Sequence, residues 1–566
     1  MMKINSKIKL VVLSLGLFLF SCETTELDLT DSPNALSPEQ ASPDFFLNAV
    51  QEDFARLMGA NGGFGDIGAE LTRIHYMFGR QYNQNYSADS FNGEWSSAYA
   101  GILTDLNVMY GLAEEGNLQR HIGIGRTLEA FLIVTLVDFF GDIPYTEAIQ
   151  GQEGNFNPVL DPGADVYNQA LGLLDIAEAA FTGDTARDPD FDLYYDNDFD
   201  LWVRLVNSLR IKIFAQRRLV DPNAVTSINN IIAGGNYIMD PSQDFQFQWG
   251  TNLANPDTRS PQYAANYINT GAAEYMSNHL MFYMMSDKVG NASATFEGMD
   301  PRMRFYYYRQ TDATPGAGGE PPSQQELGCS VETPPAHYVD GGFNFCNLPG
   351  GFWGRDHGDD DGIPPDGLLR TVWGVYPFGS RFDDDTFAPV DQGIGAGGAG
   401  VTPILLSSTI DFLRAEIALD AGDAATARML MLEGIQKSFT KVRSFGALDA
   451  NADLSFAAPT TDDDDYITEV GELFDAGSAT ERMNLLANEF FVTLFGNGLD
   501  AYNFYRRVGA PFVLLPNLEP NPGAFIRSHF FPGSLANNNS NVTQKSGVTE
   551  RVFWDTNPEA GFPIAN

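Results

Sequence analysis

The most constraining feature of this sequence is an apolar segment that reads as a helix without a polar face. One face of 124–140 carries apolar residues at helical spacing, namely Ile124, Leu128, Phe131, Leu132, Leu136 and Phe139. The opposite face carries Ile133, Val134 and Val137, so we expect the helix to be buried nearly all round. Glu129 and Asp138 argue against a membrane span. With 43% hydrophobic and 12% aromatic residues, the chain has enough apolar material for the large core that such burial requires.

Two helical blocks flank an irregular region. In the first block, about 41–235, further helices are predicted near 43–58, 93–115, 164–182, 198–220 and 223–233. The second block covers about 405–510. Its clearest unit is the helix Phe412–Leu419, then Gly422 and Asp423, which supply a turn and the N-cap of a helix from Ala424. This unit resembles a tetratricopeptide hairpin, although no strict period of about 34 residues can be followed. The pattern predicts a mainly α fold.

The region between the blocks, 236–404, is rich in Gly, Pro, Asp and aromatic residues, and the tail 511–566 is again loop-like. Loops of this length in a compact protein are usually functional or disordered. The many aromatic side chains favour packed, functional loops. We therefore expect one body, 41–566, in which this loop-rich insert faces the ligand and carries few short strands.

The N-terminus is typical of an exported lipoprotein. Lys3, Lys7 and Lys9 precede an apolar run that is too short to span a bilayer, so 1–21 reads as a signal peptide. The run ends in a lipobox-like sequence whose Cys22 would become the lipidated N-terminus, and 22–40 forms an acidic tether. A non-lipidated signal peptide is the alternative, because Phe20 is bulky for its place.

Acidic residues outnumber basic ones 74 to 33, which gives a formal net charge of −41. This charge excludes nucleic acid and anionic lipid heads as partners, since both carry negative charge themselves. It also disfavours strongly anionic ligands unless a local basic pocket opposes the global field. The membrane is expected as a partner through the lipid anchor only.

Only two other cysteines exist, Cys329 and Cys346. Export places them in an oxidising compartment, where a disulfide is the natural expectation. The bond would close a loop of about 17 residues and contribute roughly 3 kcal/mol in the chain-entropy description.

Several segments, in the expected order, resemble the SusD/RagB family of nutrient-binding outer-membrane lipoproteins. The most specific is Val137–Ala148, with its Gly-Asp-Ile-Pro-Tyr sequence, and the next is Trp202–Ile213. Supporting matches are Trp95 with Tyr99, Asp300–Arg302, Phe412–Ala418, Asp500–Arg507 and Ile526–Pro532. Together they cover nearly the whole mature chain.

The resemblance implies tetratricopeptide-like helix pairs in a right-handed helical scaffold, overlaid by variable loops. It also implies a partner, a SusC-like TonB-dependent outer-membrane barrel over which the lipoprotein sits as a lid. Ligands of the family are usually glycans and sometimes peptides. In Bacteroidota-type bacteria, acidic stretches like the one after Cys22 accompany display on the exterior of the outer membrane. In the Gly141–Pro144 turn, Asp142 is expected to bond to backbone.

Carbohydrate capture needs flat aromatic faces bordered by groups that hydrogen-bond hydroxyls. Two segments offer that mixture, and their candidate ligand-binding residues are Arg80, Tyr82, Asn83, Asn85 and Tyr86 in the first, and Trp353, Arg355, Trp373 and Tyr376 in the second. The alternative for each aromatic residue is a core anchor beneath a long loop. Trp95, Trp202 and Trp249 are expected in the core.

The loop 353–367 is rich in carboxylates, and such loops can hold calcium. Asp356, Asp359 and Asp361 are the candidate ligands for a structural calcium ion. The EF-hand register fails there, so a solvated acidic loop and direct ligand contact remain open. The run Asp383–Asp385 is expected to be solvated surface.

No catalytic motif is present. The run Gly395–Gly400 matches GxGxxG but lacks the strand and helix that a dinucleotide site requires. There is no Walker lysine, HExxH or GxSxG, and no cofactor is expected. We expect a binding protein rather than an enzyme. The alternatives are an exported glycoside hydrolase with carboxylates on the 350–385 loops and a peptide-binding protein.

Overall fold

The computed structural model describes residues 42–558 except 152–153, 269–270, 287–298, 317–326 and 362–365. The described residues from Pro43 onward fall within one compact unit. The predicted signal peptide, Cys22 and the tether lie outside the described residues. In the part of the chain that the structure describes, no helix is both long and apolar enough to cross a membrane.

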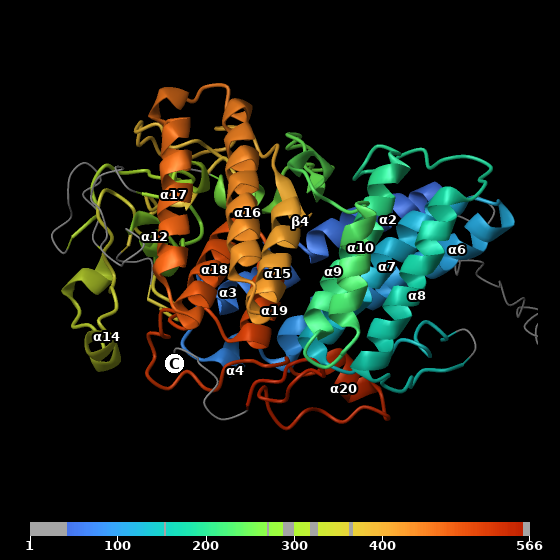
Figure 1. Ribbon diagram of the computed structural model, residues 1–566. Helices are drawn as coiled ribbons and strands as arrows, with labels where there is room; N and C mark the ends of the chain where they lie inside the picture. Colours follow the sequence, from blue (N-terminus) through green and yellow to red (C-terminus); the bar gives the residue numbers. More distant parts are fainter. Residues whose placement is uncertain are drawn as a thin grey trace, which may run out of the picture. The chain divides into compact units, whose positions relative to one another are not determined.

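The first helical block matches the predicted elements closely. Its helices are α2 (Pro43–Leu57), α3 (Phe64–Leu71), α4 (Tyr82–Asn85), α5 (Asn92–Ser96), α6 (Thr104–Glu115), α7 (Gln119–Phe140), α8 (Gly163–Thr182), α9 (Phe199–Arg217) and α10 (Ala224–Gly234). A π-helical segment, Ser97–Leu103, joins α5 to α6, so the predicted helix 93–115 is continuous. Helix α7 packs against α8, and α9 packs against α10 (Figure 1).

Helix α7 is enclosed by its neighbours, as its apolar faces predict, and 19 of its 22 residues are buried. The two acidic residues that argued against a membrane span are satisfied inside the protein. Asp138 accepts hydrogen bonds from the side chains of Tyr167, Trp554 and Asn503. Glu129 accepts bonds from the hydroxyl groups of two tyrosines, each at 2.8 Å. Polar groups on a buried helix are tolerated when they are bonded in this way.

The turn after α7 has the geometry that the sequence predicts. Gly141 ends the helix with φ +78°, a conformation that L side chains rarely adopt. The Asp142 carboxylate accepts a 2.8 Å bond from the backbone N–H of Gly163, at the start of α8. The prediction that Asp142 bonds to backbone is confirmed, and the turn fixes the approach of α7 to α8.

The second block contains consecutive packed helices. They are α15 (Ser407–Asp420), α16 (Ala424–Ser444), α17 (Thr460–Ala476), α18 (Ala479–Thr493) and α19 (Leu499–Val508). The Asp423 side chain accepts from the Thr426 N–H and caps α16, as predicted. Helix α15 packs against α16 and α18 (Figure 1). The mainly α fold with helix pairs is confirmed.

The loop-rich insert contains short helices and four short strands among its described residues. The helices are α11 (Pro261–Asn266), α12 (Asn278–Met285), α13 (Met303–Tyr306) and α14 (Ala336–Gly341), and α20 (Gly533–Asn538) lies in the tail. Strand β1 (Phe245–Gln248) pairs antiparallel with β4 (Val401–Leu405), so the two ends of the insert meet. Strand β2 (Tyr307–Tyr308) pairs with β3 (Val372–Trp373).

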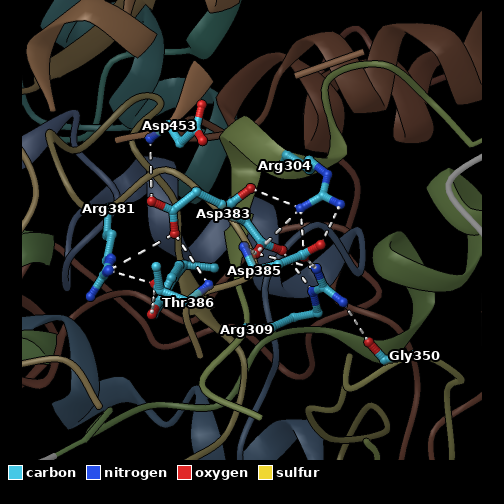
Figure 2. A network of polar contacts seen from close by, with 10 residues as sticks. Arg304, Arg309, Gly350, Arg381, Asp383, Asp385, Thr386 and Asp453 are labelled. Atoms are coloured by element: carbon cyan, nitrogen blue, oxygen red, sulfur yellow. Dashed lines mark hydrogen bonds and ion pairs between the residues drawn. The ribbon is translucent and has the colours of Figure 1, made fainter. Parts of the chain in front are cut away.

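The Asp383–Asp385 run is not solvated surface, which corrects the expectation. Asp383 is fully buried, and its carboxylate accepts a 2.7 Å bond from Nε of Arg309. Asp385 accepts from Arg304 at 2.8 Å and from Arg309. Figure 2 shows the two guanidinium groups gathered around these carboxylates. A run of acidic residues looks like surface in a sequence because the arginines that neutralise it lie far along the chain.

A disulfide joins Cys329 to Cys346, the pair that the sequence singles out. Both cysteines are buried with Leu327 and Trp353 in a small apolar cluster that is separate from the main core. The cross-link closes the loop that contains α14.

Candidate functional site

The two candidate segments, far apart in the sequence, lie side by side in the structure. Nε of Arg80 donates a 2.6 Å bond to the Asp360 carboxylate. The Tyr82 hydroxyl lies 3.2 Å from Nε2 of His357. The Tyr76 hydroxyl donates to a backbone carbonyl of the same loop. The segment 76–86 and the loop 353–361 therefore form one surface.

A pocket of about 550 Å³ opens beside this surface. Its lining combines aromatic rings, carboxylates and a few other polar groups. The lining residues are Asp66, Glu70, His75, Tyr76, Phe78, Gln262, Ala273, Glu274, Tyr275, Asp360, Asp361, Arg370 and Trp373. They come from α3, the turn after it, α11, the loop before α12, the 353–361 loop and β3. We call this cavity the α3 pocket.

The aromatic side chains of the α3 pocket differ in exposure. Phe78 is 63% exposed, whereas Tyr76 and Tyr275 are half-buried. The rings of Tyr76 and Tyr275 meet edge to face with their centroids 5.8 Å apart. Trp373 is buried in the wall, in edge contact with the ring of His75. The pocket therefore offers one exposed ring and two partly accessible ones.

Two glutamate carboxylates of the pocket accept hydrogen bonds from neutral side chains. Oε2 of Glu274 accepts bonds from the side-chain amides of Gln262 and Asn266, at 2.7 and 2.9 Å. Oε2 of Glu70 accepts a 2.5 Å bond from the hydroxyl of Tyr86. Burial, and next the charge of Asp66, raise the pKa of both glutamates. The oxygens of both glutamates remain hydrogen-bond acceptors for hydroxyl groups of a ligand.

The structure corrects the site prediction for several aromatic residues. Tyr82, Trp353 and Tyr376 are each at most 1% exposed, so their rings present no face to a ligand. Tyr376 stacks on Tyr306, and Trp353 belongs to the apolar cluster around the disulfide. These residues are the core anchors that the alternative described, and Trp95, Trp202 and Trp249 are in the core as predicted.

The remaining predicted residues have distinct positions. Arg80 is half exposed beside the pocket, whereas Arg355 is 1% exposed and pairs with Asp359 and Asp366, so it is not available to a ligand. Asn83 is exposed but does not line the pocket. Asn85 donates to the Phe78 and Gly79 carbonyls and Tyr86 bonds to Glu70, so both act on the shape of the pocket. Of the residues predicted to bind the ligand, only Trp373 lines the α3 pocket.

The three candidate calcium ligands do not converge. Asp356 is buried and accepts bonds from the Cys346 N–H and the Asn278 side chain. Asp359 faces Arg355 at 2.9 Å, and Asp361 is exposed. No group of three or more His, Cys, Asp or Glu side chains is arranged to hold a metal ion in the described part of the chain. The predicted calcium site is therefore not assembled from these residues.

Several lining residues were missed by sequence reasoning. Tyr76 and Phe78 lie just before Arg80, so extending the first candidate segment by four residues would have included them. Glu70, Glu274, Tyr275 and Arg370 carry no local signal. Glu70 lies on α3 itself, and Glu274, Tyr275 and Arg370 reach the pocket only because the insert folds back over α3.

Two other cavities differ in chemistry. One of about 330 Å³ lies beside α12 and includes His279, Phe343 and Asn488 in its lining. The other, of about 530 Å³, is lined by Trp95, Tyr99 and Phe156 among others and contains no charged side chain. The α3 pocket is the candidate site because it borders both predicted segments and combines an exposed aromatic ring with polar side chains.

Comparisons with known proteins agree with this architecture. A SusD/RagB family protein from Bacteroides thetaiotaomicron has a TM-score of 0.64 at 16% identity, over 92% of this chain and 100% of that chain. A SusD homolog from Bacteroides fragilis has a TM-score of 0.62 at 16% identity, over 91% and 99%. A chitin-binding SusD homolog from Flavobacterium johnsoniae has a TM-score of 0.58 at 16% identity, over 91% and 99%. At this identity the likeness shows the fold.

The sequence itself identifies the family. Residues 33–329 match the SusD-like family model, described as "Starch-binding associating with outer membrane". No curated protein matches the chain significantly. Because the family match covers more than half of the chain and the fold agrees, the chain belongs to the SusD-like family.

Proposed function

We propose that this protein is a surface-exposed outer-membrane lipoprotein that binds an oligosaccharide in the α3 pocket and delivers it to a SusC-like TonB-dependent transporter. The observation that carries the proposal is the pairing of an exposed ring, Phe78, with a dense set of hydrogen-bonding side chains in one pocket of about 550 Å³. The chitin-binding homolog supports a glycan as the ligand class.

Binding would follow from two kinds of contact. Apolar C–H faces of a sugar pack against aromatic rings, and Phe78 with Tyr76 and Tyr275 supplies these. Hydroxyl groups donate to carboxylate oxygens, which Glu70 and Glu274 supply. The same side chains already hold one another, so little ordering is needed when a ligand enters.

The binding test uses the mature lipoprotein in detergent micelles, titrated calorimetrically with neutral oligosaccharides. Loss of one exposed stacking ring removes about 1.4 kcal/mol, so Phe78→Ala weakens binding about tenfold. Phe191→Ala is the matched control, because Phe191 is 62% exposed and lies outside the pocket. Equal affinities of Phe78→Ala and the wild type would reject the α3 pocket as the site.

The same samples separate the alternatives. Product analysis after incubation returns the oligosaccharide intact if the protein only binds, whereas cleavage would support an exported glycoside hydrolase. Peptides added in place of glycans should show no binding. A protein that binds peptides and no glycan is the peptide-binding alternative.

Anchoring and delivery have their own tests. Cys22→Ala should leave the folded body intact but release it from membranes, and a variant that stays bound after a salt wash would refute the lipid anchor.

The lid role rests on the family resemblance. It predicts that the wild-type lipoprotein co-purifies with a TonB-dependent barrel from detergent extracts, and a lipoprotein recovered without one would contradict it.

A further inference from the structure

One buried arginine of the α3 pocket lacks an acceptor. Arg370 is 1% exposed and lines the pocket, and its backbone carbonyl accepts a 2.7 Å bond from the Gln310 side chain. Its guanidinium lies over the ring of Tyr275, at 3.6 Å from the centroid. Neither Nε nor Nη2 has a hydrogen-bond partner, and no carboxylate lies within ion-pair distance, among the described residues.

The neighbouring arginine shows what Arg370 lacks. Arg355 also lies over Tyr275, at 4.9 Å, but its guanidinium bonds to the carboxylates of Asp359 and Asp366. Buried charges in proteins are normally paired and hydrogen-bonded, because an uncompensated charge is costly. Burial lowers the pKa of Arg370, and the charge of Asp366, which lies beyond ion-pair distance, offsets this only in part. A donor left without a partner in a pocket wall is available to a ligand.

A second unpartnered group faces the same pocket. Nδ1 of His75 lies 2.8 Å from the Asp66 carboxylate and donates a hydrogen bond to it. Nε2 has no partner among the described residues, although His75 is only 3% exposed. The pocket wall thus holds buried donors at Arg370 and a buried ring nitrogen at His75 that still need partners.

The charges of the lining restrict what can satisfy both groups. Five acidic side chains line the pocket, Asp66, Glu70, Glu274, Asp360 and Asp361; Arg80 at the pocket edge pairs with Asp360 and Asp361, and Arg370 is the one guanidinium in the described lining. An anionic sugar would meet these carboxylates as like charges, which costs binding energy. A polyhydroxylated neutral sugar has oxygen acceptors for Arg370 and hydroxyl donors for His75 and the carboxylates.

We propose that Arg370 is the specificity-determining anchor of the α3 pocket, that it donates to ring-substituent oxygens of an uncharged sugar residue, and that the surrounding carboxylates exclude acidic sugars. This inference rests on the proposed function, because it names the ligand class and the anchoring residue of the same site. The Tyr275 ring beneath the guanidinium of Arg370 keeps that group in place, and the N–H groups of the guanidinium then donate to the ligand.

The experiment compares wild type, Arg370→Met and Arg370→Lys as mature lipoproteins in detergent. Probes are neutral hexasaccharides of glucose, xylose and N-acetylglucosamine, and acidic oligomers of galacturonate and of alginate. We expect at least one neutral probe to bind, Arg370→Met to weaken it by about ten- to hundredfold, and Arg370→Lys to restore part of the loss, because hydrogen bonds to charged groups are strong. Every acidic probe should bind at least tenfold more weakly than the best neutral one.

The failures are distinguishable. If neutral probes bind all three proteins equally, the anchor role is wrong while the proposed function stands. Acidic probes that bind more tightly than neutral ones overturn the ligand class. If no glycan binds the wild type, the proposed function falls together with this inference. Melting temperatures check the fold, and if Arg370→Met does not fold, equal binding by Arg370→Lys and the wild type overturns the anchor role.

Discussion

Two groups of buried arginines in the loop-rich insert differ in what their guanidinium groups contact. Arg304 and Arg309 share the carboxylates of Asp383 and Asp385, and Arg309 also donates to the Gly350 carbonyl (Figure 2). The guanidinium of Arg370, at the α3 pocket, lies over the Tyr275 ring, and its Nε and Nη2 have no hydrogen-bond partner among the described residues. All three arginines are less than one-tenth exposed, so burial alone does not distinguish them.

The difference separates a structural charge from a functional one. In the Arg304–Arg309 cluster, the carboxylates compensate both cations, and the cluster has nothing left to offer a ligand. At Arg370, two N–H donors in the wall of a cavity have no acceptor among the described residues, so no hydrogen bond within the fold offsets the free-energy cost of burying them. Buried polar groups without partners are uncommon in proteins, so their position in a pocket is informative.

The largest expected effect comes from breaking the compensated cluster. Asp383→Asn keeps the shape of the side chain but removes the charge that Arg304 and Arg309 share. Removing one partner of a buried pair costs about 3–5 kcal/mol, because the other charge is left uncompensated. Urea unfolding of the lipoprotein should show this loss in the free energy of unfolding.

Asp384→Asn is the matched control for this variant. Asp384 is also buried, but its oxygens accept from backbone N–H groups of Thr386 and Asp453, and its one arginine neighbour among the described residues, Arg381, is 3.9 Å away and partly solvated. Its replacement should cost only about 1 kcal/mol. Equal losses for the two variants would show that the arginine charges do not depend on Asp383.

A second prediction concerns a buried carboxylate that no arginine contacts in the described structure. Asp356 is held by the Cys346 N–H and the Asn278 amide, and burial raises its pKa to about 6. A raised pKa means that the folded state binds the proton more tightly than the unfolded state. The stability contribution is therefore complete below about pH 4 and is lost as the pH rises through about 6. The loss is on the order of 3 kcal/mol.

The measurement is the free energy of unfolding between pH 4 and pH 7 for the wild type and Asp356→Asn. The variant cannot titrate at this position, so its stability should fall less steeply over that range. The comparison uses the slopes, because Asn also changes the hydrogen bonds. Identical slopes would mean that Asp356 is ionised throughout.

The sequence predicts the helical scaffold well because periodicity is a local property. Helix α7 has apolar residues on all sides, and Asp423 precedes α16 as a cap, so both were visible without the structure. The pocket is different, because its lining is brought together by long-range packing. Phe78 and Trp353 look alike in a sequence, yet one ring is exposed and the other is fully buried.

The charged groups of the insert show the same limit. Asp383 looked like solvated surface because its partner Arg309 lies 74 residues away. Arg370 lies in a sequence of ordinary loop character, and its lack of a partner is visible only when all its neighbours are in place. Local sequence pattern thus predicts which segments are rich in polar and aromatic groups. Whether a polar group has a hydrogen-bond partner depends on the whole fold.

The smallest expected change in stability provides the sharpest test of the comparison. Arg370→Met removes a buried charge that has no carboxylate partner in the described structure and leaves an apolar chain over Tyr275, so the free energy of unfolding should stay within about 1 kcal/mol of the wild type or increase. Arg355→Met, over the same ring, leaves Asp359 and Asp366 uncompensated and should cost about 3 kcal/mol. If Arg370→Met lowers the free energy of unfolding as much as Arg355→Met does, Arg370 stabilises the fold. Its unpartnered donors would then no longer indicate a ligand-binding role.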